Sequence, residues 1–465
     1  MKFPRSKASH KRELILHSDS VDTQRTRSTH SSRPAGPRPA GTAYGAPFWF
    51  AYVANTAVMI AVSLLFRYAD FVNFLGGTEF NLGWIVGVGM VGSLLMRLLQ
   101  GVGIDLYGAR RVWLLSGFGL VLSCLGHLLI QHVDGPAIFV MRILLNTSIA
   151  GMFGASITYI SSRAPAARMA EMIGMLGTSG FVGMMIGPRL GDWLFDTATI
   201  QRRQLDGMFL LAAAVGAASL VLAAASTRGY RHPPRRKQPP MAWLLRRYHP
   251  GPLLPVAVVM GFGLGLPGVF LRPFAVSLGI NEIALFFMVY APTAFLMRLA
   301  TRRLPSRFGA RPMVLTGLCC LILGTLLYLV VRSEWQLVMP AIVLGTAHAL
   351  LFPSVVAGGS SGFPARYRGL ATTLMLAMFD LGNLIGAPTV GIVLRYAGRA
   401  GLPRYPSMFL SVATLFTIVM LYYALAGRDA SSKVRITRSS RRRRTTSAAE
   451  ETPSAVVTVD TAGPT

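Results

Sequence analysis

The side chain with the clearest chemical potential in this 465-residue chain is the carboxylate of Asp380. It lies about ten residues inside a long apolar run, which at a helical rise of about 1.5 Å per residue is about 15 Å deep. A carboxylate buried without a nearby cation tends to hold a proton, so Asp380 could take up and release one. Asn383 would share its helix face. The alternative is an acid that only packs helices by bonding to a neighbour.

An arginine in another apolar run is the second candidate. Arg142 lies about six residues inside its run, which is about 9 Å deep in a helix, and Asn146 follows one turn later on the same face. The guanidinium could bind an anionic group or favour the charged form of a nearby carboxylate. The alternative is that this long side chain reaches back to the membrane surface.

Further ionisable side chains interrupt apolar runs. His348 could relay protons, although a lone histidine on an apolar helix is more often a core residue. Arg67 and Asp70 stand three residues apart near the end of an apolar run. They could form an ion pair that acts as a gate, or they could simply lie where that run meets water. Arg97 and Arg298 each come shortly before a basic turn, and this repetition favours an architectural role over substrate specificity.

The runs that hold these residues are long enough to be membrane helices. Hydrophobic residues make up 52% of the chain and charged residues only 14%, whereas a soluble protein carries roughly 25% charged residues. A segment of about 20 mainly apolar residues can cross a bilayer. Twelve spans are predicted in chain order, at 48–72, 82–104, 111–131, 136–162, 171–196, 206–226, 253–277, 282–302, 311–332, 335–360, 368–396 and 405–427.

The arginines between the spans indicate the orientation of the chain. Basic residues gather in alternate loops and in both tails, which is typical of cytoplasmic loops, so both termini are predicted inside. The net charge of +28 then reflects topology rather than nucleic-acid binding, because no basic stripe alternates with exposed aromatics. The predicted domains are a disordered basic tail 1–47, a six-helix bundle 48–226, a basic cytoplasmic linker 227–252, a second six-helix bundle 253–427 and a disordered basic tail 428–465.

Two basic segments leave alternatives open. Met241–Tyr248 in the linker could be a short helix on the inner membrane surface, or simply part of a solvated connection. The polybasic run Arg441–Arg444 could bind anionic lipid, although fixing the topology is the favoured interpretation.

Several classes of function find no support in the sequence. Cys124, Cys319 and Cys320 all lie in apolar runs and show neither a disulfide framework nor zinc spacing. No phosphate-binding glycine loop is present, which argues against direct drive by ATP. No catalytic triad and no pair of catalytic carboxylates is visible either. We therefore expect no cofactor, no metal and no enzymatic activity.

A glycine-rich basic turn recurs in the second half of the chain. Met96-Arg97-Leu98 and Gly108-Ala109-Arg110 return in the same order and spacing as Met297-Arg298-Leu299 and Gly309-Ala310-Arg311. A second block repeats likewise: Arg168 just before span 5, and Pro188 and Gly191 within it, correspond to Arg368, Pro388 and Gly391 of span 11. Two related sets of six spans are the layout of a parallel duplication, with substrate bound between the halves.

The turn carries a family resemblance. Gly101-x-x-x-Asp105-x-x-Gly108-x-Arg110-Arg111 resembles the signature between spans 2 and 3 of the major facilitator superfamily. The glycines of span 5, Gly183-x-x-x-Gly187-Pro188-x-x-Gly191, are similar to that family's antiporter and exporter motif. Arg142 resembles its span 4 arginine, with Asn146 where a glycine is usual. Three short phrases resemble the bacterial arabinose-efflux-like branch, namely Phe286-Phe287 with Tyr290, Phe352-Pro353 and Asp380-Leu381-Gly382.

The resemblance implies an all-α membrane protein of twelve transmembrane helices. These would form two six-helix bundles related by a pseudo-two-fold axis, with both termini cytoplasmic, working by alternating access. It also implies a latch in which Asp105 meets the amino end of span 11, where a helix dipole favours an acid. Ser306 stands in place of that acid in the second half, so the latch would be one-sided.

The resulting functional prediction is a proton-coupled exporter of a small organic solute in a bacterial inner membrane. Its partners would be the solute, protons and the bilayer, and the protein is predicted to be a monomer. An importer, or a facilitator without ion coupling, would use the same residues. A membrane sensor that has lost transport is the alternative from another class, with the basic tails as its output surface.

Overall fold

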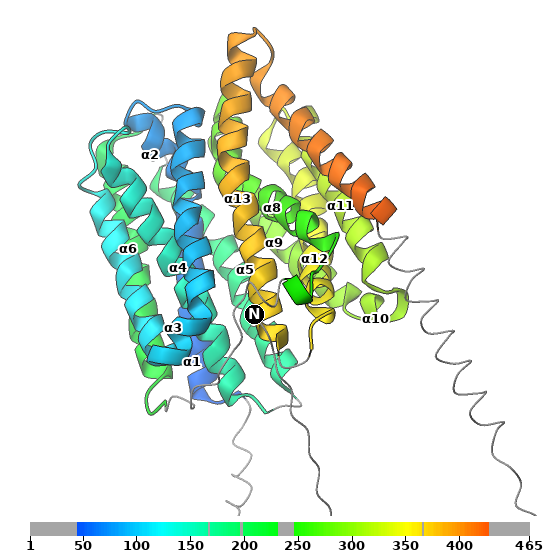
Figure 1. Ribbon diagram of the computed structural model, residues 1–465. Helices are drawn as coiled ribbons and strands as arrows, with labels where there is room; N and C mark the ends of the chain where they lie inside the picture. Colours follow the sequence, from blue (N-terminus) through cyan, green and yellow to red (C-terminus); the bar gives the residue numbers. More distant parts are fainter. Residues whose placement is uncertain (1–43, 166–167, 196–198, 231–245, 365–366, 427–465) are drawn as a thin grey trace, which may run out of the picture. The chain divides into compact units, whose positions relative to one another are not determined.

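A computed structural model describes residues 44–165, 168–195, 199–230, 246–364 and 367–426 (Figure 1). All of them belong to one compact unit, Ala43–Thr465. The predicted N-terminal tail lies outside the described residues except for 44–47. The predicted C-terminal tail, from Arg428 onward, lies outside them entirely. Most of the predicted surface helix Met241–Tyr248 is outside as well, so these three expectations stay predictions.

The first half of the described chain consists of helices that cross the unit from end to end. Its first span consists of three consecutive elements: the helix α1, the 3-10 turn η1 and the short helix α2. The elements are α1 (Ala46–Leu64), η1 (Leu65–Arg67), α2 (Tyr68–Phe74), α3 (Glu79–His127), α4 (Pro136–Arg163), α5 (Met169–Leu194) and α6 (Arg202–Ser226).

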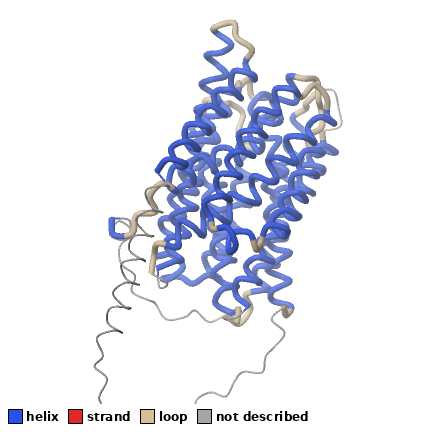
Figure 2. Tube along the Cα trace, turned by 90° about the vertical axis from the view of Figure 1, so that its right-hand side faces the viewer, coloured by secondary structure: helices blue, strands red, loops and turns tan. Residues whose placement is uncertain are grey.

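The second half repeats this arrangement. Its elements are α8 (Leu253–Ser277), α9 (Ala284–Thr301), α10 (Leu304–Phe308), α11 (Ala310–Leu327), η3 (Tyr328–Val330), η4 (Glu334–Leu337), α12 (Val338–Ser361) and α13 (Arg368–Arg399). A final helix covers Arg404–Ala426. The described residues contain helices and connections, and Figure 2 shows the loops gathered at the two ends of the helices.

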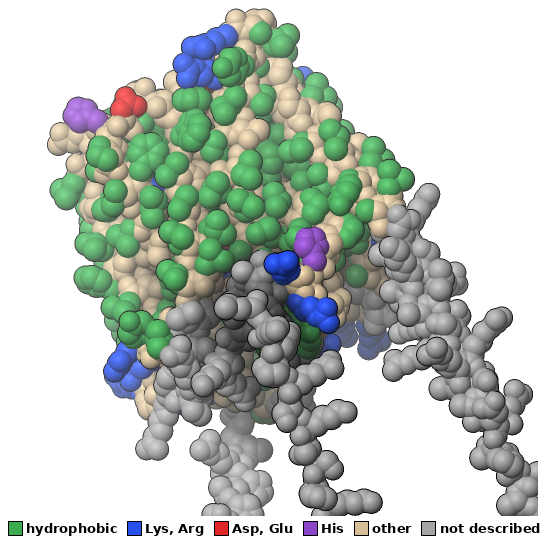
Figure 3. Space-filling model, in the orientation of Figure 1, with side chains coloured by type: hydrophobic (Ala, Val, Ile, Leu, Met, Phe, Trp, Pro, Cys, Tyr) green, Lys and Arg blue, Asp and Glu red, His purple; other side chains and the backbone are tan. Residues whose placement is uncertain are grey.

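The helices have the composition that a membrane requires. Within the described ranges, 11 helices are long and apolar enough to cross a bilayer, and their bounds lie within a few residues of the predicted spans. The remaining predicted span is present as α5, 26 residues long, whose many glycines lower its hydropathy. Apolar side chains cover the middle of the face seen in Figure 3, while Lys and Arg lie toward its two ends. The predicted fold class of twelve membrane helices is confirmed.

The turn between spans 2 and 3 is a break within one long helix rather than a loop. Helix α3 continues through it, with non-helical backbone at Gly108, where φ is 82° and ψ is 151°. Gly309, its counterpart before α11, has φ 86°. A left-handed φ is accessible to glycine at little cost and strains other residues. The repeated Gly-Ala-Arg blocks therefore form the same local structure twice.

The two most extensive contacts between the halves are helix pairs, and the first is very close. Helix α3 packs along α13, and α5 packs on α9. A Cβ added at Gly83 of α3 would lie 2.4 Å from the carbonyl oxygen of Ala387, and one at Gly87 would lie 2.4 Å from the Pro388 ring. Small residues let helix backbones approach in this way. The antiparallel contact continues along both helices to Asp380.

Candidate functional site

Asp380 lies at the contact between α13 and α3. Its side chain accepts a hydrogen bond of 2.6 Å from the Ser93 hydroxyl through Oδ2. Arg97 donates to the same oxygen through Nε and to Oδ1 through Nη2, the latter at 3.4 Å. Asp380 is buried, while the Arg97 side chain keeps 16% of its surface exposed. A carboxylate from one half is thus neutralised by a cation from the other.

This ion pair changes the interpretation of both residues. Asp380 is not an isolated buried acid, because the guanidinium of Arg97 compensates its charge. Uptake of a proton by Asp380 would remove the charge that holds Arg97. The pairing was not predicted, because Arg97 was interpreted as part of the shared architecture of the repeats. Its position within an apolar span is the signal that could have indicated a partner.

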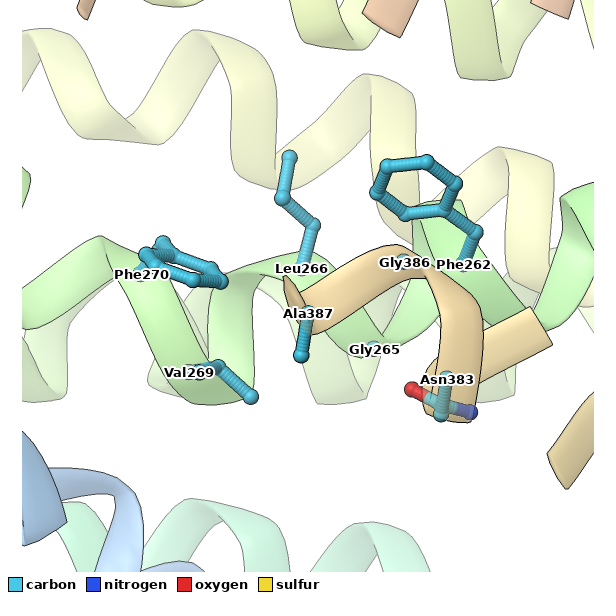
Figure 4. Close-up of a pocket in the computed structure, with 8 residues that line it drawn as sticks. All are labelled: Phe262, Gly265, Leu266, Val269, Phe270, Asn383, Gly386 and Ala387. Atoms are coloured by element: carbon cyan, nitrogen blue, oxygen red, sulfur yellow. The ribbon is translucent and has the colours of Figure 1, made fainter. Parts of the chain in front are cut away.

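Asn383 lies one turn beyond Asp380 but has different neighbours. Its amide nitrogen donates to the Phe379 carbonyl at 3.2 Å. Figure 4 shows Asn383 at one end of a small pocket between α13 and α8, with the ring of Phe262 toward the same end and that of Phe270 at the other. The rest of the lining is apolar or glycine. This pocket therefore offers a single amide group and no charge to a ligand.

Arg142 lies inside the first half, against an aromatic ring. Its guanidinium carbon is 4.3 Å from the centroid of Tyr68, which is a cation–π distance. Its Nε and Nη1 atoms are buried and have no hydrogen-bond partner among the described residues, and the same holds for Nδ2 of Asn146. The hydroxyl of Tyr68 lies 3.2 Å from Nε2 of His127. The predicted pair Arg142 and Asn146 thus lies together, with unused donors.

Arg67 and Asp70 form an ion pair, which is the first of the two predicted alternatives. The pair belongs to a larger network. Arg67 Nε donates to Asp70 at 2.8 Å, and Arg67 Nη1 lies 3.1 Å from the carboxylate of Asp192 in α5. Arg272 of α8 binds the other side of Asp70 at 3.0 Å. All four side chains are at most 6% exposed. Two arginines and two acids from both halves therefore neutralise one another.

Backbone groups complete this network. Asp192 Oδ2 accepts hydrogen bonds from the backbone N–H groups of Ile283, at 2.9 Å, and Ala284, at 2.7 Å. These groups start α9, and the amino end of a helix favours an acid. Arg272 donates in turn to the Asn281 carbonyl at 2.7 Å. The residues cluster where α2 and α5 end and α9 begins, which is the predicted outer end.

His348 lies in an aromatic environment at the contact between the halves. Its Nδ1 is 2.7 Å from the Tyr290 hydroxyl. Its ring lies 5.5 Å from that of Phe181 in α5 and 5.7 Å from that of Phe352. These contacts fit the core interpretation and leave a proton-relay role as a prediction.

The predicted gating motif is described only in part. Gly108 has the left-handed backbone given above, Arg110 is partly exposed and Arg111 is exposed. The side chain of Asp105 and the residue Gly101 lie outside the part whose surroundings the structure describes. The latch between Asp105 and the amino end of α13 thus stays a prediction.

The glycines of span 5 divide into two groups. Gly183 and Gly187 face α1, where the Ser63 hydroxyl donates to the Gly183 carbonyl at 2.9 Å, and Gly191 faces Arg67. Pro188 lies inside α5. Nearer the start of the helix, a Cβ at Gly174, Gly177 or Gly180 would meet no atom within 4 Å. The motif is thus a packing surface toward the predicted outer end, and α5 borders open space toward the inner end.

Three residues of these contacts were not predicted. Asp192 and Arg272 complete the outer network, and Ser93 supports Asp380. Asp192 and Arg272 each place a charge in a predicted span, which is costly enough in a membrane to mark them as candidates. Ser93 carries no such mark, because a lone serine in an apolar helix usually bonds to its own backbone.

Comparison with known proteins agrees with this geometry. The family model described as "Major Facilitator Superfamily" matches residues 48–332 and 253–458. A protein of Agrobacterium vitis named "Putative tartrate transporter" is 26% identical over 163 residues, and the match covers 34% of each chain. The chain thus spans about a third of the length of the curated relatives it matches.

Solved structures show the same fold. The nucleoside transporter NupG gives a TM-score of 0.65 at 14% identity, covering 83% of this chain and 99% of that one. A D-xylose–proton symporter gives 0.67 at 14% identity, covering 81% and 96%. The chain therefore belongs to the major facilitator superfamily and is a multi-pass membrane protein.

Proposed function

We propose that this protein exports a small organic solute in exchange for protons by alternating access. The observation that carries the proposal is the ion pair between Asp380 and Arg97, which joins α13 to α3 across the two halves. A titratable group at such a contact can couple proton binding to the relative movement of the halves. Protonation removes the negative charge, and the remaining contact with Arg97 is then no longer an ion pair.

The contrast between the two ends supports alternating access. The network of Arg67, Asp70, Asp192 and Arg272 joins the halves at the predicted outer end. Toward the predicted inner end, Gly174, Gly177 and Gly180 border open space. Closure at one end with space at the other is the arrangement expected of a transporter in an inward-facing state. The opposite state requires the network to separate.

Protonation of Asp380 and solute binding would favour different states in such a cycle. Release of Arg97 from Asp380 weakens the contact between α3 and α13, so proton uptake favours rearrangement of the halves. Return of the proton restores the ion pair. Antiport needs solute and proton to favour different states, and the charge of Asp380 supplies that difference.

The direction rests on the family motif in span 5. Gly183-x-x-x-Gly187-Pro188-x-x-Gly191 is similar to the motif of antiporters and exporters. The same ion pair would serve uptake equally well, because Asp380 can carry a proton in either direction. Localisation in a bacterial inner membrane, and the monomeric state, belong to the same proposal.

A solute screen in membrane vesicles with an imposed pH gradient tests the proposal. Tartrate is the first compound to try, on the name of the Agrobacterium vitis relatives. Inside-out vesicles with an acid interior should accumulate the solute against its gradient, and release of the pH gradient should abolish accumulation. Right-side-out vesicles that accumulate it instead would replace export by uptake.

The Asp380→Asn variant isolates the coupling step. It keeps the shape of the side chain and removes the titratable group. We expect exchange of solute down its own gradient to continue while accumulation driven by the pH gradient is lost. Full accumulation by Asp380→Asn vesicles would exclude proton coupling at this residue.

A further inference from the structure

Arg298 in α9 is a cation without an anionic partner. It forms no ion pair with any described residue, and its Nε atom is buried without a hydrogen-bond partner among them. Its guanidinium carbon lies 5.3 Å from the centroid of Phe181 in α5 and 5.8 Å from that of Phe352 in α12. The two rings come from different halves, so Arg298 lies at the contact between them. Arg298 itself is only partly exposed, and a cation withdrawn from water with this few partners is costly unless something else binds it.

The internal repeat shows what this position lacks. Arg298 occupies the place in the second half that Arg97 occupies in the first, since both stand within a Met-Arg-Leu block. Arg97 is neutralised by Asp380 and lies beside Ser93. The counterpart of Asp380 is Gly180, which stands as far before Pro188 as Asp380 stands before Pro388.

The supporting hydroxyl is missing as well. Ser93 stands one helical turn before Arg97, and the residue one turn before Arg298 is Ala294. The second contact between the halves, α5 on α9, therefore keeps the arginine of the first contact and lacks both oxygen-bearing partners.

Space is present where the missing carboxylate would be. A Cβ added at Gly180 would meet no atom within 4 Å. Gly180 directly precedes Phe181, whose ring contacts the Arg298 guanidinium. We infer that Arg298 binds a carboxylate of the transported solute in the space that the side chain of Asp380 fills in the other half. The inference rests on the proposed transport function and names the class of its solute as an organic carboxylate.

The surroundings of Arg298 favour a carboxylate on a small organic frame. A guanidinium binds a carboxylate through two parallel hydrogen bonds, and such pairs are strong where water is excluded. Phe181 and Phe352 provide apolar surface for the carbon skeleton beside the charge. Because these rings belong to α5 and α12, a bound solute would contact both halves. The solute would thereby join α5 to α9 as Asp380 joins α13 to α3.

Binding of defined carboxylates to the purified full-length protein tests the inference independently of transport. Isothermal titration with succinate and with tartrate measures affinity, and succinamide is the neutral analogue. We expect the wild type to bind at least one of the two carboxylates and to bind succinamide far more weakly. Loss of a charged hydrogen-bond partner costs enough to weaken binding about ten- to hundred-fold in Arg298→Gln.

A substitution at Gly180 gives the sharper test, because it restores the missing acid. Gly180→Asp places a carboxylate where the solute's would bind, so the protein should compete with its own ligand and bind at least about ten-fold more weakly than Gly180→Asn. Gly174→Asp is the control for adding charge to α5, since a Cβ there also meets no atom within 4 Å. It should bind like the wild type.

The results separate this inference from the proposed function. Binding that is unchanged in both Arg298→Gln and Gly180→Asp would overturn the inference, even where vesicles transport the solute. Equal weakening by Gly180→Asp and Gly180→Asn would overturn it too, as would a wild type that binds neither carboxylate. Charge-dependent binding without proton-driven accumulation in vesicles would leave the carboxylate site in place and remove the proposed coupling.

Discussion

Two buried charge clusters join the halves of this protein, and they differ in how many partners each charge has. In the outer network, Asp70 binds both Arg67 and Arg272, and Asp192 binds Arg67 as well as two backbone N–H groups. In the other cluster, Asp380 binds Arg97 and the Ser93 hydroxyl. Neutralising one acid of the outer network leaves the other acid in place, whereas neutralising Asp380 removes its cluster's only described negative charge.

The difference suggests separate roles in the proposed cycle. A network with redundant charges resists the uptake of a single proton, so it suits a contact that closes one end. A single pair responds fully to one proton, so it suits a switch. Exposure agrees, since the side chain of Arg97 is 16% exposed while Arg67 is 2% exposed. The effect of removing one charge should therefore differ between the two clusters, both in its magnitude and in the property that changes.

The largest effect is expected from Arg272→Ala. This change leaves Asp70 and Asp192 to share Arg67 as their only cation and removes the connection from α8. Breaking a buried ion pair costs about 3–5 kcal/mol. The predicted outer end should open more often. Labelling of a cysteine placed near this network by a membrane-impermeant reagent, added from outside, should become markedly faster.

The exposed ion pair between Arg189 and Glu282 is a matched control. It also joins α5 to the second half, at Glu282 just before α9, with a separation of 3.0 Å, but its side chains are 62% and 48% exposed. Exposed pairs contribute about 0–1 kcal/mol, so Arg189→Ala should leave the labelling rate nearly unchanged. Equal rates in the two variants would contradict the closing role of the buried network.

The second prediction concerns the pair in the other cluster. Arg97→Gln and Asp380→Asn each leave an uncompensated buried charge, whereas the double variant leaves none. The double variant should therefore recover thermal stability relative to the Arg97→Gln single variant, with a coupling energy of about 0.5–3 kcal/mol. Melting of the purified protein in detergent measures it. Additive losses would show that the ion pair contributes nothing to the contact of the halves.

The third prediction uses the two groups of glycines in α5. A Cβ at Gly187 would lie 2.1 Å from the Ser63 hydroxyl and 2.7 Å from the Ile60 carbonyl oxygen. Gly187→Ala should thus lower stability by about 1–3 kcal/mol, the usual cost of overpacking. Gly177→Ala is the control, because its Cβ meets no atom within 4 Å. A melting temperature lowered equally by both variants would contradict the division of the helix.

Much of this architecture could be predicted from residue type and spacing. Apolar runs predict membrane helices because the bilayer leaves few other ways to satisfy a backbone, and the bounds of α8, Leu253–Ser277, are those of the predicted span. The turn that contains Gly108 could be predicted because glycines and arginines interrupt the apolar sequence there. Partners are different, because whether Asp380 meets Arg97 or Arg142 depends on the rotation and tilt of two helices that hydrophobicity does not fix. Arg67 with Asp70 was within reach since both stand on one helix face.

The smallest effect is expected from Ser93→Ala. This variant tests how much the hydroxyl beside Arg97, which has no counterpart beside Arg298, contributes to proton coupling. The Ser93 hydroxyl donates to Asp380 at 2.6 Å, and removal of such a bond costs about 1 kcal/mol. Arg97 remains, so transport should continue with the proton-driven accumulation reduced several-fold at most. Initial rates in vesicles at a fixed pH gradient measure this. Complete loss of coupling in Ser93→Ala, as severe as in Asp380→Asn, would mean that the hydroxyl itself relays the proton. Arg97 would then act as a fixed counter-charge, and the absence of a hydroxyl at Ala294 would be as decisive for the second contact as the absence of an acid at Gly180.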